Sequence, residues 1–132
     1  MKANIWNKEM ECMSRKDLEA LQLERLKALV DYCDKNVKFY HDRFEKNGIT
    51  ADKIKCLSDI QYIPYTTKDD LRDTYPFGML SVPQKKIVRV HASSGTTGKA
   101  TVVGYTRRDI EIWAECVARC FTMAGVSKDD II

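Results

Sequence analysis

The pattern of hydrophobic residues changes near residue 86, and this change limits the folds that the chain can adopt. Before it, apolar residues recur at helical spacing from about residue 14 to residue 47. After it, residues 86–92 are rich in β-branched side chains and alternate in polarity, the pattern of a strand. We therefore predict an α/β fold, which is α+β within this chain. Residues 1–85 are expected to form a helical subdomain with a turn-rich connector, and residues 86–132 the start of an α/β domain.

The first helix is predicted from a start signal, an apolar stripe and a stop signal. Ser14 and Asp17 have the spacing of a capping box, in which side chains satisfy backbone N–H groups at a helix start. The stripe on one face consists of Leu18, Leu21, Leu26, Leu29 and Cys33. Gly48 is the stop, because glycine adopts the left-handed conformation that ends helices. The segment predicts one helix, or a pair with a break near Asn36.

Two further capping boxes predict helices later in the chain. Thr67 with Asp70 opens a short helix, and Thr106 with Asp109 opens a longer one that Gly125 ends. The apolar stripe of the longer helix consists of Ile110, Trp113, Val117 and Phe121, and we expect Trp113 and Phe121 to pack in a core. After residue 86 the expected order is strand, loop, strand and helix.

Composition and charge exclude several classes of protein. Hydrophobic residues make up 44% and charged residues 31%, a balance that excludes a disordered tail or a fibrous repeat. The chain has no apolar run of about 18 residues and its N-terminus has no apolar signal core, so we expect a soluble cytoplasmic protein without a membrane partner. The net charge is +3 with acids and bases interleaved, which argues against nucleic-acid binding.

Two features predict that the chain is incomplete. Residues 127–132 have the pattern of a further element's start. A hairpin of two strands is also marginal in water unless another strand or a helix covers it. We therefore expect a truncated chain, whose unpaired strand edges and uncovered apolar face favour self-association or a homodimer.

Residues 93–99 connect the two predicted strands and have the composition of a phosphate site. The segment reads Ser93, Ser94, Gly95, Thr96, Thr97, Gly98, Lys99. Its glycines allow the backbone to approach a ligand closely, and successive N–H groups in such a turn form an anion-binding nest. Its four hydroxyls add donors, and its lysine adds a charge for phosphate oxygens. These groups together suit a polyphosphate.

The segment is not a Walker A loop. That motif requires glycine where Ser93 stands and a serine or threonine where Ala100 stands. The Gly-x-Gly-x-x-Gly pattern of dinucleotide sites is also missing.

The run from Ser93 to Gly98 resembles the phosphate-binding loop of the adenylate-forming superfamily, which includes the acyl-CoA synthetases. Residues 90–109 are similar to the phenylacetate–CoA ligase branch in particular, as are residues 6–7, 38–40 and 62–72. The resemblance thus covers nearly the whole chain. It departs from the family pattern at Ala100, where the family usually has proline.

This resemblance implies an enzyme that activates a carboxylic acid, phenylacetate in this branch, with ATP through an acyl-adenylate and then transfers the acyl group to coenzyme A. It implies ATP, Mg²⁺ and coenzyme A as cofactors or substrates, with residues 93–99 at the nucleotide phosphates. Family members are several times longer than this chain. The acyl pocket and the catalytic residues are therefore expected outside it, and the chain alone is expected to be inactive.

Two alternatives to this function stay open. A sibling ligase would adenylate another aryl acid or a cofactor carboxylate. In a different class, the chain would be a non-catalytic helical interaction module with an anion-binding loop. His91, two residues before the loop, either contacts a phosphate or substrate or packs under its strand.

A metal site is not expected. Cys116 and Cys120 are four residues apart on a predicted helix, a spacing that metal ligands use. The chain offers only His41 and His91 as histidine ligands to complete such a site. We therefore expect both cysteines to pack in a core as reduced thiols.

Overall fold

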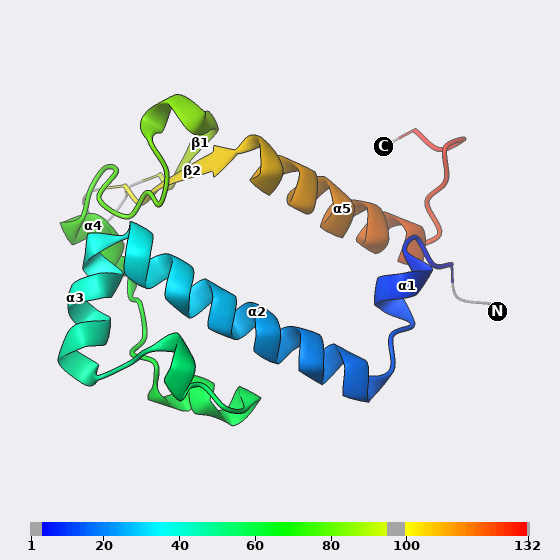
Figure 1. Ribbon diagram of the computed structural model, residues 1–132. Helices are drawn as coiled ribbons and strands as arrows, with labels where there is room; N and C mark the ends of the chain where they lie inside the picture. Colours follow the sequence, from blue (N-terminus) through cyan, green and yellow to red (C-terminus); the bar gives the residue numbers. More distant parts are fainter. Residues whose placement is uncertain (1–3, 95–99, 132) are drawn as a thin grey trace.

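The computed structural model describes residues 4–94 and 100–131 (Figure 1). Its helices and strands are α1 (Lys8–Glu11), α2 (Arg15–Asn36), α3 (Lys38–Asn47), α4 (Lys68–Asp73), β1 (Ile87–Ala92), β2 (Val102–Thr106) and α5 (Arg107–Met123). Short 3₁₀ helices cover Ala51–Lys53, Leu57–Tyr62 and Gln84–Lys86. The predicted fold class is confirmed, whereas α1 and the 3₁₀ helices were not predicted. Among the described helices, none is long and apolar enough to cross a membrane.

The helix pair α2 and α3 has the boundaries that the sequence predicts. The Asp17 N–H donates to Ser14 Oγ at 3.2 Å, which caps the start of α2. Val37 separates the two helices, because its backbone is extended, with φ −130° and ψ 107°. Gly48 follows α3 in the left-handed region at φ 63°. Of the two predicted alternatives, the pair with a break near Asn36 is therefore the correct one.

The hydrophobic core lies between α2, α3 and the segment that follows α3. Its buried residues Val30, Phe44 and Ile54 are each at most 4% exposed. The residues packed around them are Leu23, Leu26, Cys33, Tyr40, Ile49, Ala51 and Ile63. The predicted stripe on α2 is partly wrong, since Leu29 is 57% exposed. The helix carries apolar residues on more than one face, and packing against α3 selects the face that contains Val30.

The second part of the chain is an antiparallel hairpin followed directly by α5. Ala92 lies opposite Val102, and the capping box of Thr106 with Asp109 starts α5 immediately after β2. In Figure 1, α5 runs from the hairpin toward α1, which lies near the start of α2. None of the described residues of the hairpin or α5 is buried.

The apolar stripe of α5 lacks the cover that the sequence pattern predicts. Trp113 and Phe121 keep 41% and 42% of their surface exposed. The expectation that they form core is therefore wrong for this chain. The physical reason is that one two-stranded sheet is the main element that packs against this helix, and it covers only part of the face.

Candidate functional site

The candidate site lies at the end of the hairpin, where the predicted phosphate-binding segment begins. The Ser93 N–H donates to the Thr101 carbonyl oxygen at 3.0 Å, and the Thr101 N–H donates to Ser93 Oγ at 3.0 Å. Ser93 and Ser94 are both exposed. The other predicted members, Gly95, Thr96, Thr97, Gly98 and Lys99, lie outside the described residues. A phosphate contact by residues 93–99 therefore stays a prediction.

An aromatic cluster lies beside this strand end. The His91 ring lies edge-on to Tyr105 with centroids 5.0 Å apart, and edge-on to Trp113 at 5.5 Å. Tyr105 and Trp113 stack at 5.7 Å. The cluster therefore joins β1, β2 and α5. His91 contacts these two rings but is exposed, so it is not packed beneath its strand. Its role toward a phosphate or substrate stays a prediction.

A hydrogen-bonded carboxylate connects the N-terminal segment to α5. The Trp6 indole N–H donates to Glu115 Oε2 at 2.8 Å, and the Asn7 side-chain amide donates to Oε1 at 2.9 Å. Arg119 donates to the same Oε1 at 2.7 Å. These hydrogen bonds, with Asn7 first, lower the pKa of Glu115 to about 2, so the group is ionised at neutral pH. Trp6 and Asn7 belong to a segment that resembles the ligase branch, but no local sequence pattern predicts that Glu115 is their partner.

A second carboxylate connects the connector to α3. Arg43 donates two hydrogen bonds to Asp70, at 2.8 and 3.2 Å, and one to the Tyr65 carbonyl oxygen at 2.6 Å. Its guanidinium carbon also lies 4.2 Å from the ring centroid of Phe39. The Arg43 hydrogen bonds and then the Thr67 N–H lower the pKa of Asp70 to about 2. This bidentate pair fixes the start of α4 against α3, and no sequence pattern predicts it.

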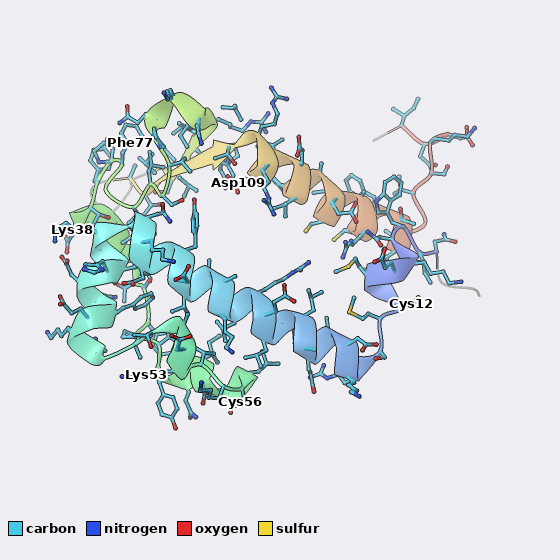
Figure 2. All side chains as sticks on the ribbon, viewed as in Figure 1. Cys12, Lys38, Lys53, Cys56, Phe77 and Asp109 are labelled. Carbon is cyan, nitrogen blue, oxygen red and sulfur yellow. The ribbon has the colours of Figure 1, made fainter. Side chains whose placement is uncertain are left out.

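The start of α5 fixes the other end of the hairpin. The Thr106 N–H and hydroxyl each donate to Asp109 Oδ2 at 2.7 Å, which confirms the predicted capping box. Figure 2 shows Asp109 in the first turn of α5, next to β2. The strand that leads away from the candidate site therefore continues into a well-capped helix.

The cysteine pair on α5 forms no site in the described residues. Cys116 and Cys120 are both exposed, so the expectation that they pack in a core is wrong. Cys116 instead lines an open cavity together with Asn7, Met10 and Arg25. Within residues 4–94 and 100–131, no group of three histidine, cysteine, aspartate or glutamate side chains is placed to hold a metal ion.

Comparison with known proteins relates this arrangement to CoA ligases. The chain is 50% identical over 123 residues to the phenylacetate-coenzyme A ligase of Aromatoleum evansii. The aligned region covers 93% of this chain and 28% of that protein. It is 49% identical over 121 residues to the enzyme of the same name from Thermus thermophilus, covering 92% of this chain and 27% of that protein. The Escherichia coli K12 enzyme is 49% identical over 123 residues, with 93% and 28% covered. No family model matches the chain.

Solved structures give the same relationship. A 2-hydroxyisobutyryl-CoA ligase in complex with 2-HIB-AMP and CoA matches with a TM-score of 0.89 and 30% identity, over 97% of this chain and 28% of that one. Its open conformation matches with a TM-score of 0.85 and 28% identity, over 95% and 30%. The predicted resemblance to the CoA ligases is confirmed. The chain spans about a quarter of the length of these relatives, which fits the expected N-terminal piece of such an enzyme.

Proposed function

We propose that the chain is part of an AMP-forming acid–thiol ligase that converts phenylacetate, ATP and coenzyme A into phenylacetyl-CoA, AMP and pyrophosphate. The observation that carries this proposal is the 50% identity to a phenylacetate-coenzyme A ligase over 93% of the chain. The structural relatives in complex with an acyl-adenylate and CoA support the same two-step chemistry.

In this proposal residues 93–99 bind the ATP polyphosphate. The donor set fits that group, because it combines hydroxyls, a lysine and two glycines and contains no acidic side chain. The substrate carboxylate attacks the α-phosphorus, so the protein must position the phosphates and offset their developing charge. Mg²⁺ accompanies the nucleotide and neutralises charge on the phosphate oxygens when bound.

The two parts of the chain have different roles in this proposal. Residues 86–132 begin the nucleotide-binding domain, and residues 1–85 form a helical subdomain that braces it. The position of the core supports this division, since all of its buried residues precede residue 55. The Glu115 hydrogen bonds to Trp6 and Asn7 provide the brace between the parts.

A second candidate is a sibling ligase for another acid. The structural relatives keep it open, because they share 28 to 30% of their residues with this chain and are named as ligases for an acid other than phenylacetate. In both candidates the phosphate segment has the same task. They differ in an acyl pocket to which no described residue is assigned.

The substrate is tested by ATP–pyrophosphate exchange with the full-length protein that contains this chain. Phenylacetate, benzoate and 2-hydroxyisobutyrate are compared at equal concentration. We expect the greatest exchange with phenylacetate, and no phenylacetate-dependent AMP release from the 132-residue chain alone. Greater exchange with another acid would favour the sibling ligase. ATP binding without exchange for any acid would favour an anion-binding interaction module.

The phosphate role is tested by Lys99→Ala in the full-length protein. If the lysine binds the departing pyrophosphate, its loss slows adenylation by about 10- to 1,000-fold. It leaves CoA transfer from preformed acyl-adenylate unchanged. The matched control is Lys85→Ala, an exposed lysine before β1, which should change both half-reactions by less than about 2-fold. Equal losses in both half-reactions of Lys99→Ala would contradict the assigned role.

A further inference from the structure

The last pair of the hairpin differs from a regular antiparallel ladder. Ala92 lies opposite Val102, so Ser93 and Thr101 are the next facing residues. In a regular hydrogen-bonded pair, each residue donates its N–H to the carbonyl oxygen of the other. Here Ser93 donates to the Thr101 carbonyl, but the Thr101 N–H donates to Ser93 Oγ, also at 3.0 Å. The hydroxyl of Ser93 thus takes the place of its own carbonyl oxygen.

Because the side chain of Ser93 accepts this hydrogen bond, the backbone can leave the ladder at Ser93 while Thr101 stays hydrogen-bonded to it. Hairpin connections usually contain about two to five residues. Residues 94–100, seven in all, separate this pair. A longer connection costs more closure entropy, and its strand ends separate more easily. The bond from the Thr101 N–H to Ser93 Oγ keeps a second hydrogen bond at the base of the connection, which offsets that tendency.

Packing supports the same strand end from β1. His91 and Ser93 are two residues apart in extended backbone, so their side chains share a face of the sheet. The His91 ring contacts Tyr105 and Trp113, with centroids 5.0 and 5.5 Å apart. These contacts hold both strands against α5 one step before the pair of Ser93 and Thr101. The base of the connection is thus fixed by a packed cluster and then by a hydroxyl.

We propose that Ser93 is a positioning residue, whose hydroxyl oxygen fastens the two ends of the connection through Thr101. The inference rests on the proposed function, in which this connection binds the ATP phosphates. It assigns the acceptor oxygen of Ser93 to the support of the phosphate-binding connection. Because Ser93 is exposed, its substitution leaves the core intact.

The first test is amide hydrogen exchange at Thr101 in the full-length protein without nucleotide. Ser93→Ala removes the acceptor and should raise the exchange rate of this amide by about 3- to 10-fold, the effect of one ordinary hydrogen bond. Ser93→Thr keeps the oxygen and should stay within about 2-fold of the unsubstituted protein. Ser94→Ala is the neighbouring control and should also leave Thr101 unchanged. Unchanged exchange in Ser93→Ala would overturn the proposal.

The second test follows the same variants in ATP–pyrophosphate exchange. The value of kcat/KM for ATP should fall by about 3- to 10-fold in Ser93→Ala and recover in Ser93→Thr, because only the acceptor oxygen matters. A lower kcat/KM in Ser93→Ala without faster exchange of the Thr101 amide would show that the hydroxyl acts on the nucleotide and not through Thr101, and would overturn the proposal. If the unsubstituted protein gives no exchange with any acid, the proposed function fails, while the Thr101 measurement still decides the positioning role.

Discussion

The helix pair α2–α3 and the unit formed by β1, β2 and α5 both carry apolar stripes, but they bury them to different degrees. Val30, Val37, Phe44 and Ile54 are at most 4% exposed. By contrast, Val88, Val90 and Trp113 are 53%, 50% and 41% exposed. The first stripe meets α3 and the 3₁₀ segments on its open side, whereas the second packs mainly against the hairpin among the described elements. A stripe becomes a core only where a second element covers it.

Local signals do not explain this difference. The capping box at the start of α5 has both reciprocal hydrogen bonds. At the start of α2, Ser14 Oγ accepts from the Asp17 N–H and donates to Asp17 Oδ2, and the reciprocal bond to the Ser14 backbone is missing. The better capped helix is thus the less buried one. Caps determine where a helix begins, and tertiary cover determines how much stability its apolar face contributes.

The largest expected effect compares one phenylalanine from each part. Phe44 is 4% exposed and Phe121 is 42% exposed. Phe44→Ala should lower the free energy of unfolding by about 3–5 kcal/mol, because it leaves a cavity in the core. Phe121→Ala should cost about 1 kcal/mol, since much of that ring is already in water. Urea unfolding of the chain, followed by far-ultraviolet circular dichroism, measures both. Equal losses would show that α5 belongs to the same core.

A smaller effect is expected on self-association through the uncovered hairpin face. Val90→Lys should weaken association by about 10-fold, because burying a valine contributes about 1.5 kcal/mol and 1.4 kcal/mol is a factor of ten. Ser58→Lys adds the same charge to the helical part and serves as the control. Sedimentation velocity over a range of concentrations measures the equilibrium. A strictly monomeric chain at high concentration would contradict the prediction that this face is a template for association.

Two glycines with positive φ provide a matched pair at about 1 kcal/mol. Gly48 ends α3 at φ 63°, and Gly125 follows α5 at φ 91°. Alanine at either position is strained by roughly 1–2 kcal/mol. We expect Gly48→Ala to lower the urea midpoint of the helical core, and Gly125→Ala to leave that midpoint nearly unchanged. A similar shift in both variants would mean that the two parts unfold as one cooperative unit.

The features that the sequence predicts are local ones. Ser14, Gly48 and the Thr106 box depend on residues within one helical turn, so their patterns are readable without a structure. The choice of Val30 over Leu29 as the buried side of α2 depends on α3, and sequence periodicity alone does not determine it. The pairs of Arg43 with Asp70 and of Trp6 with Glu115 join residues 27 and 109 positions apart, and no local pattern marks such partners.

The candidate site divides in the same way. The composition of residues 93–99 predicts a phosphate segment because the residue types themselves carry the chemistry. That Ser93 Oγ accepts a hydrogen bond from Thr101 depends on strand register, which composition does not determine. The proposed positioning role of Ser93 therefore depends on the structure and not on composition.

The smallest expected effect is a pH dependence that differs between the two parts. Asp70 in the helical part and Glu115 on α5 both have their pKa lowered to about 2. Their unfolded values are about 3.9 and 4.3. A lowered folded pKa stabilises the folded state above the unfolded value, and this stability is lost as pH falls through the folded value. Each pair should therefore weaken between about pH 4 and pH 2, modestly, because both are partly exposed and screened by salt.

The effects of the two carboxylates on stability can be measured separately, because Trp113 lies in the second part and Trp6 is hydrogen-bonded to it. Trp6 donates to Glu115 at 2.8 Å and Trp113 lies on α5, so tryptophan fluorescence reports on that part. Circular dichroism instead follows mainly α2 and α3, the longest helical region. Asp70→Asn should flatten the acid dependence of the dichroism midpoint and leave the fluorescence midpoint unchanged, whereas Glu115→Gln should do the reverse. If each variant alters both midpoints equally, the Glu115 hydrogen bonds couple the two parts more strongly than their difference in burial indicates.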